Sequence, residues 1–146
     1  MEIREIQRDE LPQLLALYRY LHPEGWLEEG PDAQKIWQAI QAVPDYHIVV
    51  AEEGGELVST CTLLIVPNLT HQGRPYGLIE NVVTHPAHRG KDLATGCLHF
   101  ARQLAQEQGC YKLMLMTGSK QESTLRFYRE AGYRDDQKTA FVQWLP

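Results

Sequence analysis

The stretch from Glu80 to Gly96 constrains this chain more than any other, because it joins a buried-strand pattern to a helix start through a basic turn. It contains the β-branched run Val82-Val83-Thr84, turns at Pro86 and presents Arg89-Gly90-Lys91 directly before a helical pattern that opens at Leu93. The first N–H groups of a helix lack intrahelical partners and carry about half a positive charge from the helix dipole. The stretch therefore predicts a binding site for an anion such as a phosphate group.

The side chains of the turn suit the same ligand. Arg89 and Lys91 add full positive charges, and Gly90 lets the backbone approach a ligand closely. The alternative is that the glycine and the lysine serve only turn geometry and solubility, as at many strand-to-helix junctions. A second block, Ser123 to Tyr133, favours the anion site, because it reads Ser-Thr-Leu-Arg-Phe-Tyr-Arg-Glu-Ala-Gly-Tyr.

Together the two blocks resemble the GNAT superfamily of acyl-CoA-dependent N-acetyltransferases. The first is similar to the family's Arg-x-x-Gly-x-Gly/Ala pyrophosphate loop, with Arg89 and Ala94 at its ends, and the second is similar to its Phe-Tyr-x-x-x-Gly-Phe/Tyr signature. The resemblance covers essentially the whole chain, weakly before Tyr46 and strongly after Gly77. One residue departs from the pattern: Asp92 stands where the family usually has the central glycine, and its carboxylate could cap the helix but cannot attract a phosphate.

This resemblance implies a single α/β (α+β) domain over residues 1–146, with a mixed central sheet of about six to seven strands and helices on both faces. The residue patterns predict the same order, β-α-α-β-β-β-α-β-α-β-β. The expected strands span 3–7, 46–52, 57–66, 76–84, 112–117, 133–134 and 139–144, and the expected helices span 9–21 with Asp9 as the cap, 32–43, 93–108 and 121–131.

Composition and charge limit the binding partners and the cellular compartment that we expect for this protein. The net charge of −5 argues against nucleic acid, which normally requires a basic face. No apolar run approaches the roughly twenty residues of a membrane span, and the first residues are unlike a signal peptide, so we expect a cytoplasmic protein with no membrane partner. Cys61, Cys97 and Cys110 lack metal or redox spacing, and we expect small buried hydrophobic residues, with a reactive thiol as the alternative. No metal is expected, because the histidines also lack a ligand spacing.

The resemblance also implies how acetyl-CoA would be held. Its pyrophosphate would contact the turn and the first N–H groups of the helix, that is Arg89, Gly90, Lys91, Asp92, Leu93, Ala94 and Thr95. Its pantetheine arm, which carries amide groups, would pair with strand backbone at Val82 and Val83, whose alternative role is core packing. Gln121 stands where many family members have an asparagine that contacts pantetheine. Phe127 belongs to the family signature, and its simplest role is also core packing.

Acetyl transfer to an amine needs a proton acceptor and benefits from a proton donor. An alkylamine with a pKa near 10 is about three units from neutral at pH 7, which costs about 4 kcal/mol. Glu80 is the candidate base, because it places a carboxylate in an otherwise apolar strand, where the pKa of a carboxyl tends to be raised. Tyr128 is the candidate acid for the departing thiolate, because a phenol stays protonated at working pH. The alternatives are a structural ion pair for Glu80 and surface packing for Tyr128.

The leading functional hypothesis is therefore an N-acetyltransferase that moves the acetyl group of acetyl-CoA to a primary amine of a small molecule, by direct attack in a ternary complex. Two alternatives remain open, a non-catalytic acyl-CoA sensor and an acetyltransferase for protein or peptide amines. Residues 79–83 and 109–112 resemble glucosamine-phosphate N-acetyltransferases, which makes an amino sugar one candidate acceptor. Arg74 and Lys120 are the candidate side chains for the phosphate of that acceptor.

The acceptor pocket and the oligomeric state follow from the resemblance alone. In the family, residues 18–31 would form one wall of the acceptor pocket, so that Tyr18, Tyr20, His22 and Trp26 could touch the substrate. The loop 67–75, with His71, would form another wall. GNAT proteins are often dimers, and the apolar residues up to Trp144 offer material for a homodimer interface.

Overall fold

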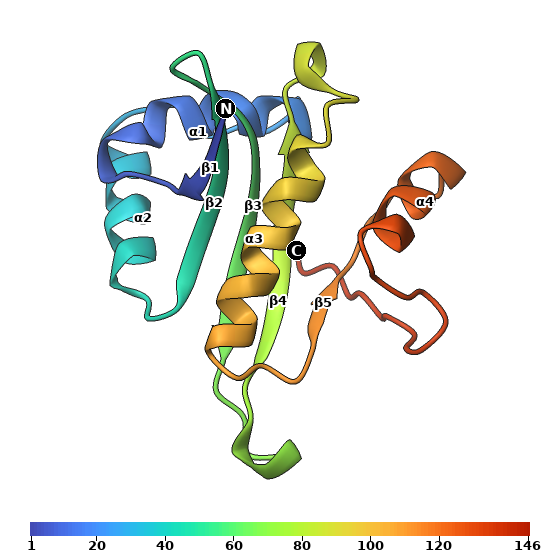
Figure 1. The fold of residues 1–146 in the computed structure, drawn as a ribbon. Coiled ribbons are helices and arrows are strands. Elements are labelled where there is room, and N and C mark those ends of the chain that lie inside the picture. Colours follow the sequence, from blue (N-terminus) through green and yellow to red (C-terminus); the bar gives the residue numbers. More distant parts are fainter.

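One five-stranded sheet forms the centre of the computed structural model, which describes residues 1–146 (Figure 1). Its strands lie side by side in chain order: β1 (Glu2–Glu5), β2 (Tyr46–Glu53), β3 (Glu56–Val66), β4 (Tyr76–Thr84) and β5 (Leu113–Leu115). The first four strands pair antiparallel, and β5 pairs parallel with β4. The predicted mixed sheet and α/β class are confirmed, with five strands in place of the expected six to seven.

Helices cover both faces of this sheet. Two of them, α1 (Leu11–Leu21) and α2 (Pro31–Ala42), lie on one face, and α3 (Leu93–Glu107) lies on the other (Figure 1). The fourth, α4 (Glu122–Glu130), follows β5 and contacts the core on the α3 side through Phe127 and Tyr128. The sheet therefore separates two apolar clusters. Alternate residues of each central strand enter opposite clusters, because successive side chains of a strand point to opposite faces.

The start of α1 differs from the prediction. A 3-10 turn, Arg8–Glu10, precedes the helix, and Glu10 occupies the cap position in place of Asp9. The Glu10 carboxylate accepts a hydrogen bond from the N–H of Gln7 at 2.8 Å and also receives the guanidinium of Arg4 at 2.6 Å. This ion pair lowers the pKa of the Glu10 carboxyl. Glu10 is thus fixed by a residue of β1, a contact between elements that the local pattern does not encode.

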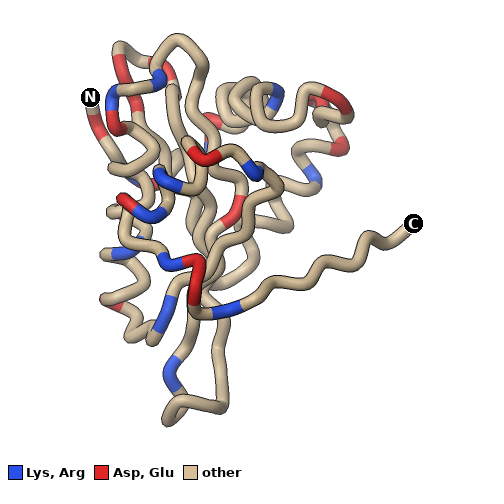
Figure 2. Tube along the Cα trace, turned by 90° about the vertical axis from the view of Figure 1, so that its right-hand side faces the viewer, with Lys and Arg blue, Asp and Glu red and all other residues tan.

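The end of the chain differs more. Neither 133–134 nor 139–144 forms a strand, and the last backbone hydrogen bond joins the N–H of Tyr133 to the carbonyl of Tyr128 at 3.0 Å. Figure 2 shows the final residues leaving the rest of the chain as an extended tail. Residues with strand propensity form a strand only where another strand offers its N–H and C=O groups. Within one copy of this chain, no strand does so for residues 134–146.

The three cysteines follow the expectation of buried, apolar side chains only in part. Cys61 and Cys97 are buried in the cluster beneath α3, and burial raises the pKa of the Cys97 thiol to about 12, so both behave as small apolar residues. Cys110 is only partly buried.

None of the helices combines the length and the apolar character that a bilayer crossing requires.

Gly77 offers a test of the contact between β4 and β5. A Cβ at this position would overlap the side chain of Leu113 on β5 and would lie 3.0 Å from Cδ1 of Leu63 on β3. We expect Gly77→Ala to lower the free energy of unfolding by about 1–3 kcal/mol, because a methyl group must displace packed side chains. Urea unfolding followed by circular dichroism measures this loss.

Gly118→Ala is the matched control, since a Cβ there meets nothing within 4 Å and the φ angle is not positive. We expect it to change the unfolding free energy by less than about 0.5 kcal/mol. Equal losses in the two variants would show that the β4–β5 contact is not tight.

Candidate functional site

The predicted anion loop connects the end of β4 to the start of α3. After the 3-10 turn Pro86–His88, Gly90 adopts φ 78° and Asp92 adopts φ 58°, both left-handed. The first helical hydrogen bond of α3 runs from the N–H of Gly96 to the carbonyl of Asp92, at 3.0 Å. The three preceding N–H groups, those of residues 93–95, donate to no backbone acceptor and stand at the positive end of a fifteen-residue helix. This is the arrangement that holds a phosphate.

Asp92 occupies the cap position of α3, but its carboxylate makes no capping hydrogen bond. The carboxylate capping that the sequence suggested is therefore absent. The left-handed φ of 58° gives a physical reason for a glycine at this position in the family, since glycine adopts such angles without steric cost. Aspartate tolerates them better than most residues, so the loop keeps its shape and gains a negative charge.

The two basic side chains of the loop are in different situations. Lys91 lies 3.4 Å from the carboxylate of Glu53, at the end of β2, and the same carboxylate lies 2.7 Å from Nδ1 of His88. Hydrogen bonds from His88 and Lys91 lower the pKa of the Glu53 carboxyl. Arg89 is exposed and has no ion pair or side-chain hydrogen bond. Arg89 is thus the free cation of the loop, and Lys91 is shared with a carboxylate.

The end of β4 is open on the side that faces β5. The two strands pair only from Gly77 to Ile79 of β4, and the chain beyond has no strand partner on that side. A register shift against β3 follows, at which Asn81 adopts φ 52°. Val82 packs into the cluster beneath α3, and Val83 packs into the cluster beneath α1 and α2. Their side chains are core residues, while this backbone lies at the strand edge that the pantetheine hypothesis requires.

Glu80 lies on the face of the sheet that α1 covers, because it pairs in register with Thr62 of β3. It forms no ion pair, so the structure does not contain the arginine pairing that was the structural alternative. Its side chain is exposed, and the apolar enclosure expected from the sequence is therefore absent. Burial and the nearby Glu80 carboxylate raise the pKa of Tyr46, which places that phenol close to the candidate base.

A buried polar group lies beside Glu80 that the sequence did not reveal. Burial raises the pKa of Tyr18 to about 12, partly offset by the adjacent side chains of Thr62 and Asn81. The hydroxyl of Thr62 has no hydrogen-bond partner, although this residue is only 3% exposed. Long-range strand pairing brings these residues together, and no local signal in the sequence shows it.

The remaining predicted residues come from α4 and the turn before it. Tyr128 is half-buried, and burial raises its pKa, which keeps the phenol protonated at neutral pH. Its ring lies edge-on to Phe127, with centroids 4.9 Å apart, and Phe127 packs against the core. Gln121 caps α4 through its carbonyl, which accepts the N–H groups of Thr124 and Leu125, and its side chain is exposed. No hydrogen bond joins Tyr128 to Glu80.

Two residues expected at the acceptor pocket are engaged elsewhere. Tyr20 lies 3.2 Å from Nε2 of His85, so the end of α1 contacts the anion loop. Arg74 donates from its guanidinium to the carbonyls of Gly109 and Cys110 at 3.0 and 3.1 Å, which ties the loop before β4 to the turn before β5. Of the two basic side chains expected to bind an acceptor phosphate, only Lys120 is therefore free of such partners.

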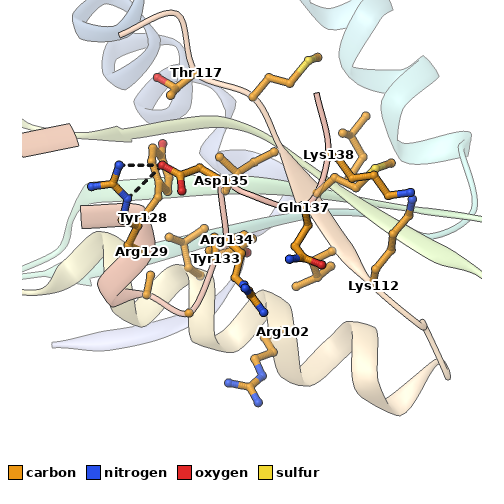
Figure 3. A pocket seen from close by; sticks show the side chains of 18 of the residues that line it. Arg102, Lys112, Thr117, Tyr128, Arg129, Tyr133, Arg134, Asp135, Gln137 and Lys138 are labelled. Carbon is orange, nitrogen blue, oxygen red and sulfur yellow. Dashed lines mark hydrogen bonds and ion pairs between the residues drawn. The ribbon is translucent and has the colours of Figure 1, made fainter. Parts of the chain in front are cut away.

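A cavity of about 990 Å³ lies beside this site rather than in it. It is lined by residues of β5, α3, α4 and the chain that follows α4, and it is open to solvent on one side (Figure 3). Of the predicted site residues, only Tyr128 lines its wall. The anion loop and Glu80 do not border this cavity, so it is a separate feature of the fold.

The geometry agrees with the comparison to known proteins. The sequence profile described as the acetyltransferase (GNAT) family matches residues 2–133. The chain belongs to this family. It is 37% identical to an acetyltransferase candidate from Agrobacterium tumefaciens strain C58, whose solved structure superposes with a TM-score of 0.93 over 99% of this chain and 100% of that one.

Relatives with named activities show which members of the family this chain resembles. The chain is 35% identical over 80 residues to glucosamine 6-phosphate N-acetyltransferase of Trypanosoma brucei brucei, which is 55% of this chain and 52% of that protein. It is 30% identical over 91 residues to aminoalkylphosphonate N-acetyltransferase of Salmonella typhimurium, which is 62% of this chain and 58% of that protein. The chain thus spans about half the length of these relatives. The predicted family and the local similarity to glucosamine-phosphate N-acetyltransferases are confirmed.

Asp92 offers the sharpest test of the anion loop. We expect Asp92→Gly to tighten acetyl-CoA binding about five-fold, since removing one like charge near a pyrophosphate is worth about 1 kcal/mol in a solvated site. Calorimetric titration of both proteins with acetyl-CoA measures the change.

The matched control is Asp45→Gly, because Asp45 also adopts φ 58° but lies in the turn before β2. It removes the same charge and the same backbone strain away from the loop, so the affinity should stay unchanged. An equal gain in both variants would assign the effect to net charge, and no gain in Asp92→Gly would remove the loop from the binding site.

Proposed function

We propose that the protein transfers the acetyl group of acetyl-CoA to a primary amine of a small molecule, by direct attack of the amine on the thioester in a ternary complex. The observation that carries the proposal is the juxtaposition of two open backbone sites. The free N–H groups at the start of α3 suit the pyrophosphate, and the open end of β4 suits the pantetheine arm. The open end of β4 begins directly after Ile79, so a pantetheine arm bound there would bring the thioester close to Glu80.

In this proposal Glu80 accepts the proton of the amine. Its carboxylate is unpaired and exposed, and it stands beside Tyr46 on the side of α1. Because the carboxylate is exposed to solvent, the proton can reach it either directly or through a water molecule. The neighbouring Tyr18 hydroxyl would orient a polar atom of the acceptor.

Tyr128 is the proposed donor to the departing thiolate. Because burial raises the pKa of its phenol, the protonated form persists over the whole working range of pH. The proton would pass from the hydroxyl of Tyr128 to the coenzyme sulfur as the bond from carbon to sulfur breaks. The edge-on contact with Tyr133, at 6.3 Å between centroids, helps to fix the orientation of the ring.

A phosphorylated or phosphonylated amine is the acceptor class that we favour. Two named relatives act, by their names, on amines of different skeletons that share such a group, glucosamine 6-phosphate and aminoalkylphosphonates. Lys120 is exposed without an ion pair directly before α4, and it is the cation of this chain that we assign to the acceptor phosphate. Arg74 is a weaker candidate, because its guanidinium already donates to two carbonyls.

An amine panel tests the function. We expect release of free coenzyme A from acetyl-CoA in the presence of glucosamine 6-phosphate or an aminoalkylphosphonate, followed with a thiol reagent. Lys120→Ala should raise the Michaelis constant of the phosphorylated amine but not that of acetyl-CoA, with Lys35→Ala on α2 as the control. Turnover only with lysine peptides would favour the peptide acetyltransferase, and acetyl-CoA binding without any turnover would favour the sensor.

Kinetics of two variants test the proposed roles. We expect Glu80→Gln to lower kcat/KM by about 10²- to 10⁴-fold at neutral pH, with recovery as the pH approaches the pKa of the amine. Tyr128→Phe should lower kcat by about 10²-fold with little change in the Michaelis constants. Glu56→Gln at the start of β3 is a control without ion pairs and should match the unmodified protein. Full activity of Glu80→Gln at every pH would exclude Glu80 as the base.

A further inference from the structure

The carboxylate of Glu53 stands at the edge of the anion loop, although it belongs to a distant part of the chain. Glu53 is the last residue of β2, directly before the hairpin turn at Gly54 and Gly55. One of its oxygens, Oε2, lies 2.7 Å from Nδ1 of His88 and 3.4 Å from Nζ of Lys91. A single oxygen of β2 therefore holds two side chains of the loop that connects β4 to α3.

The side-chain charges around the loop cancel when Glu53 is counted. Arg89 and Lys91 contribute two positive charges, and Glu53 and Asp92 contribute two negative charges. A pyrophosphate is a multiply charged anion, so a carboxylate within reach of it lowers the affinity. The two carboxylates thus oppose the ligand that the open N–H groups of residues 93–95 attract.

The two carboxylates are placed differently. Asp92 belongs to the loop itself and makes no capping hydrogen bond. Glu53 instead accepts a hydrogen bond from the ammonium group of Lys91, so this cation meets a ligand at the helix start fully only when it leaves Glu53. The Lys91 side chain is 49% exposed, and a lysine has a flexible four-carbon stem. It is therefore free to move from the carboxylate to a phosphate.

His88 allows this movement without leaving Glu53 unpaired. Its contact with the same oxygen, at 2.7 Å, does not involve Lys91. The backbone N–H of His88 donates to the carbonyl of His85 at 2.9 Å, and the two rings meet edge-on with centroids 5.4 Å apart, so the imidazole is held in place. A carboxylate that keeps one hydrogen bond loses less when a second partner departs than one that is left bare.

We infer, on the basis of the proposed function, that Glu53 is a positioning residue that sets the coenzyme affinity by holding Lys91 in the free protein and releasing it to the pyrophosphate. Glu53 does not touch the coenzyme and acts through the lysine. The loop therefore binds acetyl-CoA less tightly than its N–H groups and its cations would bind it without this carboxylate.

Calorimetric titration with acetyl-CoA tests this role without requiring turnover. We expect Glu53→Gln to tighten binding about three- to five-fold, since the amide keeps the size of the side chain and removes the charge that holds Lys91. A purely structural role predicts the opposite sign, because the loss of a support for the loop weakens binding. Glu56→Gln is the matched control, since Glu56 pairs in register with Glu53 across the hairpin and forms no ion pair. It should change the affinity less than about 1.5-fold.

A double-mutant cycle with Lys91→Ala shows whether Glu53 acts through the lysine. We expect Lys91→Ala to weaken acetyl-CoA binding about three- to five-fold, and Glu53→Gln to give less than about a 1.5-fold gain in that background. An equal gain with and without Lys91 would mean that Glu53 repels the coenzyme directly. Weaker binding by Glu53→Gln, with the circular dichroism of the unmodified protein, would mean that Glu53 only supports the loop. Either result overturns the inference.

A second ligand and the kinetics separate this role from the proposed function. S-acetylpantetheine carries the thioester but no pyrophosphate, so its affinity should be the same for Glu53→Gln and for the unmodified protein, and an equal gain for both ligands overturns the inference. With acetyl-CoA, Glu53→Gln should lower the Michaelis constant of the coenzyme and leave that of the amine unchanged. The expected binding pattern without acetyl transfer would count against the proposed function alone. Absence of acetyl-CoA binding in every variant would overturn both.

Discussion

The short pairing between β4 and β5 is the constraint on which the rest of the structure depends. The two strands share three register pairs, from Gly77 with Leu113 to Ile79 with Leu115. Gly77 leaves room for the end of the Leu113 side chain, which a Cβ at this position would overlap. Beyond these pairs β4 continues alone, shifts register at Asn81 and ends at the anion loop. One short contact therefore sets both the open backbone proposed for the coenzyme and the position of β5 at the edge of the sheet.

The anion loop combines attractive and repulsive charges, and their balance rests mainly on backbone groups. Glu53 holds Lys91 and His88, so part of the positive charge of the loop is already compensated. Asp92 adds a negative charge at the start of the helix. The N–H groups of residues 93–95 are fixed by the helix and need no side-chain ordering to meet a ligand. Together with the free guanidinium of Arg89, these N–H groups would provide most of the attraction for a bound pyrophosphate, so that the loop could tolerate the aspartate.

Local signals predicted the elements well, and contacts between elements were beyond their reach. The pattern from Glu80 to Gly96 located a strand, a turn and a helix start where the structure has them, because propensity and capping act over a few residues. The exposure of Glu80 and its proximity to Tyr46 and Thr62 depend on the pairing of distant strands, which no local pattern encodes. The final strands failed for a related reason. Their residues have strand character, but a strand also needs a partner edge, and a single copy of the chain does not provide one.

A single contact links the two halves of the proposed site. His85 accepts the N–H of Ala87 on Nδ1, at 3.1 Å, so in the neutral ring the proton lies on Nε2 and is donated to the hydroxyl of Tyr20. Tyr20 belongs to the last turn of α1, within the segment expected to line the acceptor pocket, whereas His85 opens the anion loop. A change in the path of that segment therefore acts on the turn that leads to Arg89. In the proposed function, this hydrogen bond would therefore connect the acceptor pocket to the coenzyme loop, and a substitution at Tyr20 or His85 would affect both.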